Sequence, residues 1–234
     1  MNEKVSVITV VRNDKTHIEE TIQSVLSQDY PKVEYLVIDG NSTDGTAEIC
    51  KKYRNKIENF VSEADDGIYN AMNKGLKLAT GDWIFFLNSG DTFYDKSVIS
   101  NIFNTKINSD IIYGKSITKD GRNCYFPKKV TRLMFMLERM VCHQSIFARK
   151  STFTDNYFNE SYRIIADRFW LYNCFSKHKR IIKKNCIISV YDTNGISSNW
   201  QRADAESLKF LQSISRFAYF VGKCKRIMKG LLKK

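Results

Sequence analysis

Apolar runs and helical patterns alternate along most of the chain. The strand-like runs are rich in β-branched and aromatic residues, and the segments between them carry apolar side chains at three- and four-residue spacing. Strands are expected at 5–11, 33–38, 59–62 and 83–87, helices at 16–28, 42–53 and 68–78, and a further strand–helix pass over 97–113. This alternation predicts an α/β fold with a parallel, doubly wound, Rossmann-like sheet flanked by helices.

Two acidic turns follow predicted strands. Asp39 ends the second strand, and Asn88-Ser89-Gly90-Asp91 follows the strand at 83–87. The carboxyl ends of parallel strands share one edge, where open α/β sheets bind their ligands. Two carboxylates there favour a site for a divalent cation or for sugar and base hydroxyls. A plain polar turn is the alternative, because Asn, Ser, Gly and Asp all form turns.

Three common motifs are missing from the sequence. The first strand runs into Arg12-Asn13-Asp14 without GxGxxG, and neither GxxxxGK[ST] nor GxSxG occurs. These absences argue against a dinucleotide-dependent dehydrogenase, a P-loop NTPase and an α/β-hydrolase.

Composition indicates one packed domain. The chain has 234 residues, of which 43% are hydrophobic and 13% aromatic, and no linker-like stretch. Its six cysteines form no CxxC pair, and the sequence shows no signal peptide and no apolar window of ~18 residues. We therefore expect a cytoplasmic protein with reduced thiols.

The basic charge is concentrated at the C-terminus. Lys and Arg number 37 against 25 Asp and Glu, and nine of these basic residues lie from Arg202 onward, against two acidic ones. We expect a domain over 1–200 and a helical tail over 201–234 with apolar residues at helical spacing. Such a basic amphipathic helix fits an anionic membrane surface, and an ordinary packing helix is the alternative.

Several segments together resemble a known family. They are VSVITVVRND, YLVIDGNSTDGT, SEADDGIYNAMNKGLKLATGDWIFFLNSGD, CHQSIFARK, RIIADRFWLY and NGISS, in this order. Over about residues 4–198 the chain resembles the inverting family 2 glycosyltransferases of the GT-A fold, especially bacterial enzymes of surface polysaccharide synthesis.

The resemblance implies a reaction and its main residues. A sugar would pass from a nucleoside diphosphate donor, with uridine expected, to a hydroxyl of a glycan or lipid-linked acceptor. Asp39 would hold the nucleoside and Asp65 would help to close over it. Asp91 matches the last residue of the family's DXD element and would bind Mg²⁺ or Mn²⁺, while Asp167 matches the catalytic base.

Further site residues follow from the same resemblance. Asn88 stands where DXD has its first Asp, and this lowers the negative charge of the expected metal site. The expected nucleotide-sugar-binding residues are Val10, Arg12, Asp39, Asp65, Asn73, Asn88 and Ser89. Those on the acceptor or phosphate side are His143, Gln144 and Ser197.

A different class of protein stays open at this point. Asn88 would also suit a degenerate, non-catalytic transferase fold, and the net charge of +12 would suit a nucleic-acid binder. The acidic sheet edge argues against nucleic acid, because carboxylates repel phosphates unless a cation intervenes. We therefore expect an enzyme at the cytoplasmic face of the membrane, with no nucleic-acid partner.

Overall fold

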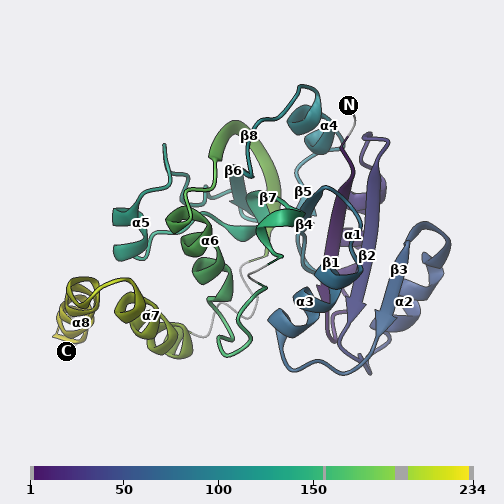
Figure 1. Cartoon of the computed structure of the whole chain (residues 1–234). Coiled ribbons are helices and arrows are strands. Elements are labelled where there is room, and N and C mark those ends of the chain that lie inside the picture. The colour runs from purple at the N-terminus through teal and green to yellow at the C-terminus, as the bar shows by residue number, and fades with distance from the viewer. Residues whose placement is uncertain (1–2, 155–156, 193–199, 232–234) are drawn as a thin grey trace.

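The computed structural model describes residues 3–154, 157–192 and 200–231. Within these residues the strands form one eight-stranded sheet in the order β3-β2-β1-β4-β7-β6-β8-β5 (Figure 1). The strands are β1 (Val5–Val11), β2 (Val33–Asp39), β3 (Asn59–Ser62), β4 (Trp83–Phe86), β5 (Thr92–Phe93), β6 (Ile111–Thr118), β7 (Ile146–Arg149) and β8 (Ile181–Tyr191).

The helices connect and cover this sheet. They are α1 (Ile18–Leu26), α2 (Thr46–Lys52), α3 (Ile68–Leu78), α4 (Val98–Phe103), α5 (Arg132–Met136), α6 (Ala166–Ser176), α7 (Trp200–Ile214) and α8 (Arg216–Leu231), with short 3-10 turns η1 (Arg54–Lys56), η2 (His143–Ser145) and η3 (Lys150–Thr152). Apolar side chains of α1, α2 and α4 pack in one core cluster, and those of α3, α6 and α7 pack in another. The sheet separates the two clusters.

The first half of the sheet is parallel, as its apolar pattern predicts. β1 pairs in parallel with β2 and with β4, and β2 pairs in parallel with β3. Every residue of β1 is buried, because helices cover both faces of the sheet at this point.

The second half departs from a purely parallel arrangement. β7 lies between β4 and β6 and is antiparallel to both, and β5 is antiparallel to β8. The sheet is therefore mixed and mostly parallel. No strand was predicted within the segment CHQSIFARK, which contains β7, because a run of four residues shows little periodicity.

The predicted tail forms two helices. α7 and α8 pack against each other and against α5, and Phe210, Leu211 and Ala218 are buried in the core. Phe217, Phe220 and Ile227 on α8 are instead 66%, 64% and 63% exposed. Part of the apolar stripe is therefore used in packing, and part faces solvent. Among the described residues, no helix combines the length and the apolarity needed to cross a membrane.

Gly75 allows α3 to lie close to the sheet. A Cβ at this position would come within 2.5 Å of Cγ2 of Ile8, which is fully buried in β1. Because the core leaves Ile8 little room to move, α3 can sit at this distance only with glycine at the contact.

We expect Gly75→Ala to lower the free energy of unfolding by about 1–3 kcal/mol, because overpacking outweighs the better helix propensity of alanine. Thermal or urea unfolding measures the change. Lys77→Ala, at an exposed position of the same helix, is the control and should stay within about 0.5 kcal/mol of the wild type. A Gly75→Ala variant as stable as the wild type would contradict this account of the contact.

Candidate active site

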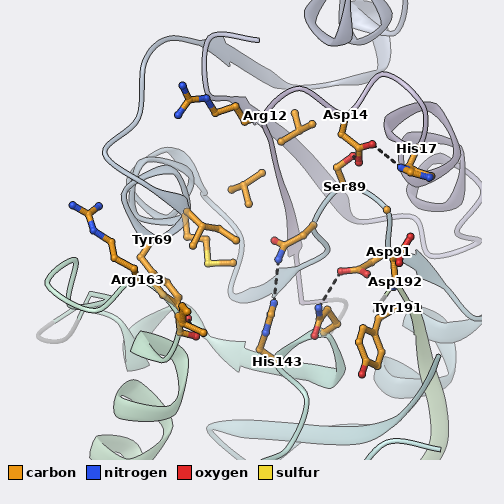
Figure 2. A pocket seen from close by; sticks show the side chains of 18 residues that line it. Arg12, Asp14, His17, Tyr69, Ser89, Asp91, His143, Arg163, Tyr191 and Asp192 are labelled. Carbon is orange, nitrogen blue, oxygen red and sulfur yellow. Dashed lines mark hydrogen bonds and ion pairs between the residues drawn. The ribbon is translucent and has the colours of Figure 1, made fainter. Parts of the chain in front are cut away.

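A cavity of about 370 Å³ opens at the carboxyl ends of β1 and β4 (Figure 2). Its walls come from the end of β1, the turn after β4, the start of α3, the turn η2 and the end of β8. The lining residues are Val10, Val11, Arg12, Asp14, His17, Ile68, Tyr69, Met72, Asn88, Ser89, Gly90, Asp91, His143, Gln144, Arg163, Ile164, Tyr191 and Asp192. The cavity therefore lies at the sheet edge where the strand order predicts a ligand site.

The turn after β4 is fixed to its neighbours by hydrogen bonds. The Ser89 amide donates to the Val10 carbonyl at 3.2 Å, and Thr21 of α1 bonds the turn twice, through the Gly90 amide and the Asp91 carbonyl. Gly90 has a φ of +91°, which a residue with a Cβ rarely adopts. The sequence Asn-Ser-Gly-Asp thus supplies both the polar groups and the glycine that this turn requires.

Asp91 is a buried carboxylate held by two donors. Its Oδ1 accepts from the Asp192 amide at 3.0 Å, and its Oδ2 accepts from Nε2 of Gln144 at 3.1 Å. Burial raises the pKa of Asp91 to about 6 and outweighs the lowering effect of these two bonds. A buried negative charge of this kind is costly by itself and favours a cation beside it.

Further acidic groups lie near Asp91. A Cβ on Gly90 would be 3.6 Å from Cβ of Asp192 and 3.9 Å from Oδ2 of Asp14. Asp14 accepts from Oγ of Ser89 at 2.7 Å and lies 2.6 Å from Nδ1 of His17. Asp14, His17 and Asp192 were not expected at the site, because only the fold brings these distant polar positions to one cavity.

The other wall of the cavity carries the imidazole of His143, and the carboxylate of Asp167 lies behind it in a smaller adjoining pocket. Nδ1 of His143 lies 3.5 Å from Oδ2 of Asp167, and the Tyr69 hydroxyl donates to Oδ1 of Asp167 at 2.9 Å. Burial favours a higher pKa of Asp167, but the contacts with His143, Arg168 and Tyr69 outweigh burial and lower that pKa. Burial and the neighbouring Asp167 raise the pKa of Tyr69 well above its ordinary value, so Tyr69 stays a hydrogen-bond donor.

Asp39 and Asp65 lie beside the cavity and are absent from its lining. Asp39 is fully buried and accepts from the amide and hydroxyl of Ser42 and from the hydroxyl of Ser62. Asp65 pairs with Lys74 at 2.6 Å and lies next to Gly40, as does Arg12. The carboxylates of Asp39 and Asp65 thus lie behind the part of the cavity wall that Val10 and Arg12 form.

The other expected site residues divide into three groups. Val10, Arg12, Asn88, Ser89, Asp91, His143 and Gln144 line the cavity together. Asn73 is buried outside it and bonds the backbone of Phe158 and the carboxylate of Glu160, which indicates a structural clamp between α3 and that loop. Ser197 lies outside the described residues.

Comparison with known proteins identifies relatives over most of the chain. Residues 6–176 match the family described as "Glycosyl transferase family 2". A "PGL/p-HBAD biosynthesis glycosyltransferase" of Mycobacterium bovis is 30% identical over 220 residues, which cover 90% of this chain and 85% of the relative.

Solved structures share the fold. S. aureus TarS 1-349 in complex with UDP-GlcNAc superposes with a TM-score of 0.75 at 23% identity, covering 90% of this chain and 65% of that one. Glucosyl-3-phosphoglycerate synthase of Mycobacterium tuberculosis, in complex with Mn²⁺, UDP and phosphoglyceric acid, gives a TM-score of 0.62 at 17% identity, covering 91% of this chain and 78% of that one.

We expect Asp91→Asn to stabilise the metal-free protein at pH 7.5. The pKa of Asp91 is about 6 in the folded chain against an ordinary 3.8, so ionisation costs the folded state above pH 6, and below about pH 4 the carboxyl is neutral in both states. The gain should therefore be on the order of 3 kcal/mol at pH 7.5 and should disappear as the pH falls from 6 to 4.

Chemical unfolding with EDTA at several pH values measures this difference. Asp29→Asn, at an exposed position, is the control and should stay within about 0.5 kcal/mol of the wild type. An Asp91→Asn variant less stable than the wild type at pH 7.5 would contradict the prediction.

Proposed function

Because the chain belongs to glycosyl transferase family 2 and so transfers sugar in glycan biosynthesis, we propose that it is a metal-dependent, inverting glycosyltransferase using a nucleoside diphosphate sugar. The proposed acceptor is a hydroxyl of a glycan or a lipid-linked glycan. The observation that carries the proposal is a cavity lined by both the buried Asp91 and His143, whose imidazole pairs with Asp167 behind it. Its volume lies in the range of small-molecule sites.

The proposed donor occupies the side of the cavity that runs from Arg12 to Asp91. The nucleoside would lie at Val10 and Arg12, with Asp39 and Asp65 behind them. Asp39 is fully buried and already accepts from Ser42 and Ser62, so its proposed contact with base or ribose requires donor binding to expose one of its remaining lone pairs. UDP is the proposed nucleotide, supported by its presence with the structural relatives TarS and glucosyl-3-phosphoglycerate synthase.

The residues present fit a divalent cation at Asp91. Asp91 would hold Mg²⁺ or Mn²⁺, and Asp192 is the nearby second carboxylate. Among the described residues, no three metal-ligating side chains are grouped closely enough to form a complete site, as expected if diphosphate and water supply the remaining ligands. When bound, the ion would stabilise the charge that develops on the departing diphosphate.

Inversion requires attack on the side of the sugar opposite the diphosphate. In the proposed reaction the His143–Asp167 pair lies on that side and assists removal of the acceptor proton, which is typically worth ~10²–10⁴-fold in rate. Gln144 is next to His143 in η2 and bonds Asp91. This bond links the proposed metal-binding carboxylate to the turn that carries His143.

We expect UDP-sugars to raise the melting temperature only in the presence of Mn²⁺ or Mg²⁺. A donor at ~100 times its dissociation constant should stabilise the wild type by about 2.7 kcal/mol. Asp91→Ala should lose most of this shift, whereas the exposed control Asp29→Asn should keep it. A thermal-shift screen of nucleotide sugars measures both.

A metal-independent, salt-sensitive shift with RNA would instead support a nucleic-acid binder. Full donor binding by Asp91→Ala would overturn the proposed metal site.

We further propose that the enzyme sits on the cytoplasmic face of an anionic membrane. Figure 1 shows α5, α7 and α8 gathered at one end of the molecule, away from β1–β3. Exposed apolar side chains on this end are Leu133, Leu137, Phe217, Phe220 and Ile227, and exposed basic ones are Lys128, Lys129, Arg132, Arg139, Lys209, Arg216 and Lys223. The nearby Glu138 is neutralised by Lys225 and Arg226. Apolar residues with surplus positive charge suit anionic lipid.

We expect the triple change Phe217→Ser, Phe220→Ser and Ile227→Ser to weaken binding to vesicles of phosphatidylglycerol and phosphatidylcholine at least tenfold in flotation. Tyr94→Ser is the matched control, because Tyr94 is also an exposed aromatic residue and lies on β5–α4, away from this end. Vesicles of phosphatidylcholine alone should bind the wild type more weakly. Unchanged flotation of the triple variant would refute the proposed membrane surface. Light scattering that shows a dimer for the wild type and a monomer for the triple variant would also refute it, because the exposed apolar residues would then form a dimer interface.

A further inference from the structure

Two cysteines from separate segments meet beside the cavity. The thiols of Cys124 and Cys142 share a hydrogen bond, and the hydroxyl of Tyr191 also bonds Cys124. Tyr191 lines the cavity next to Asp192 (Figure 2). Both cysteines are half-buried and carry free thiols. Two thiols in hydrogen-bond contact are near the separation from which a disulfide can form.

The backbone brings the two residues to the same place. The Cys124 amide donates to the Ser116 carbonyl of β6 at 3.0 Å, and Ser116 pairs with Ser189 of β8, two residues before Tyr191. Cys142 directly precedes η2, which packs against β6 and β8. Both cysteines therefore lie against the part of the sheet that ends at the cavity.

Cys142 orients the side chain that holds Asp91. Its S–H donates to Oε1 of Gln144 at 2.7 Å, and Nε2 of the same amide donates to Oδ2 of Asp91 at 3.1 Å. Because the thiol bonds the oxygen end of the amide, the nitrogen end faces the carboxylate. A disulfide sulfur carries no proton and cannot make this bond, and a flipped amide would set its oxygen against the carboxylate.

The two thiols differ in reactivity. Hydrogen bonds from Cys142 and Tyr191 lower the pKa of Cys124, whereas the bond to Cys124 and burial raise the pKa of Cys142 well above its ordinary value. Burial also raises the pKa of Cys50 and Cys174 to about 12. Because the thiolate is the reactive form, Cys124 is the expected nucleophile and Cys142 the thiol that closes the bridge.

We propose that Cys124 and Cys142 form a redox modification site, at which hydrogen peroxide produces a disulfide that frees the Gln144 amide and weakens donor binding. Formation of the bridge does not depend on the proposed function. Its effect on donor binding rests on that function, because it acts through Asp91.

The oxidation takes two steps. The Cys124 thiolate attacks one oxygen of hydrogen peroxide, the O–O bond breaks, and the departing hydroxide takes up the proton that Cys124 released, which leaves a sulfenic acid and one water. The Cys142 sulfur then attacks the sulfur of Cys124, the S–O bond breaks, and the hydroxide leaves with the Cys142 proton as a second water. The two thiols are oxidised to one disulfide, and the peroxide is reduced to two waters.

Peroxide treatment followed by peptide mass spectrometry without reduction tests for the bridge. We expect a linked pair of peptides joined through Cys124 and Cys142, with the loss of two hydrogen atoms and release by dithiothreitol. Cys186→Ser, which removes another half-buried thiol, is the control and should form the same bridge. A wild-type protein in which Cys124 and Cys142 stay unlinked would overturn the modification site.

Thermal-shift titration with UDP-GlcNAc and UDP-glucose in the presence of Mn²⁺ measures the effect on donor binding. We expect oxidation to weaken binding about tenfold, the size expected for loss of a hydrogen bond to a charged group, and dithiothreitol to restore it. Cys124→Ser should bind donor as the untreated wild type does, with or without peroxide. Cys142→Ala has no S–H for Gln144 and should bind donor about tenfold more weakly under both conditions.

The remaining outcomes separate the parts of the inference. A bridged protein with unchanged donor affinity would overturn the effect on Gln144. A Cys124→Ser variant that loses donor binding on peroxide treatment, as the wild type does, would assign the response to another residue and overturn the effect as well. A wild-type protein that forms the bridge but binds no donor before treatment would instead overturn the proposed function, and the modification site would stand.

Discussion

The site depends on one buried carboxylate that joins three distant parts of the chain. Asp91 follows β4, and it accepts hydrogen bonds from Gln144 and from the backbone of Asp192, which lie 53 and 101 residues further along. The bonds hold the turn after β4, the turn η2 and the end of β8 around one cavity. They do not remove the cost of the buried charge, since the pKa of Asp91 stays raised. The folded chain thus keeps a destabilising group where a cation would relieve it, as functional sites often do.

Charge in this molecule is separated by location. The chain carries a net +12, yet the cavity gathers the carboxylates of Asp14, Asp91 and Asp192 beside Arg12 and Arg163, and many exposed basic side chains lie at the end formed by α5, α7 and α8. A nucleic-acid-binding face would instead gather basic side chains at the ligand site itself. The separation is consistent with a small anionic ligand held through a cation and a different, larger anionic surface contacted elsewhere.

Much of the fold was predictable because apolar periodicity acts locally. The apolar run at 5–11 and the polar turn at 88–91 predicted β1, the end of β4 and the position of Asp91 at the carboxyl edge of the sheet. The family resemblance was confirmed by the match over residues 6–176. The antiparallel β7 was beyond this reasoning, because four apolar residues fit several structures equally well. Asp14, Tyr69 and Asp192 were missed for a related reason: each is an ordinary polar or aromatic residue locally, and only long-range packing brings them to the cavity. Asn73 was expected at the site from the family resemblance, and in this structure it bonds Phe158 and Glu160 outside the cavity lining.

The turn η2 places His143 and Gln144 side by side, with one side chain beside Asn88 in the cavity and the other bonded to Asp91. Because the two residues share one short turn, a backbone shift that displaces Gln144 from Asp91 would also move the imidazole. Arrival of the first substrate would in this way prepare the position of the second.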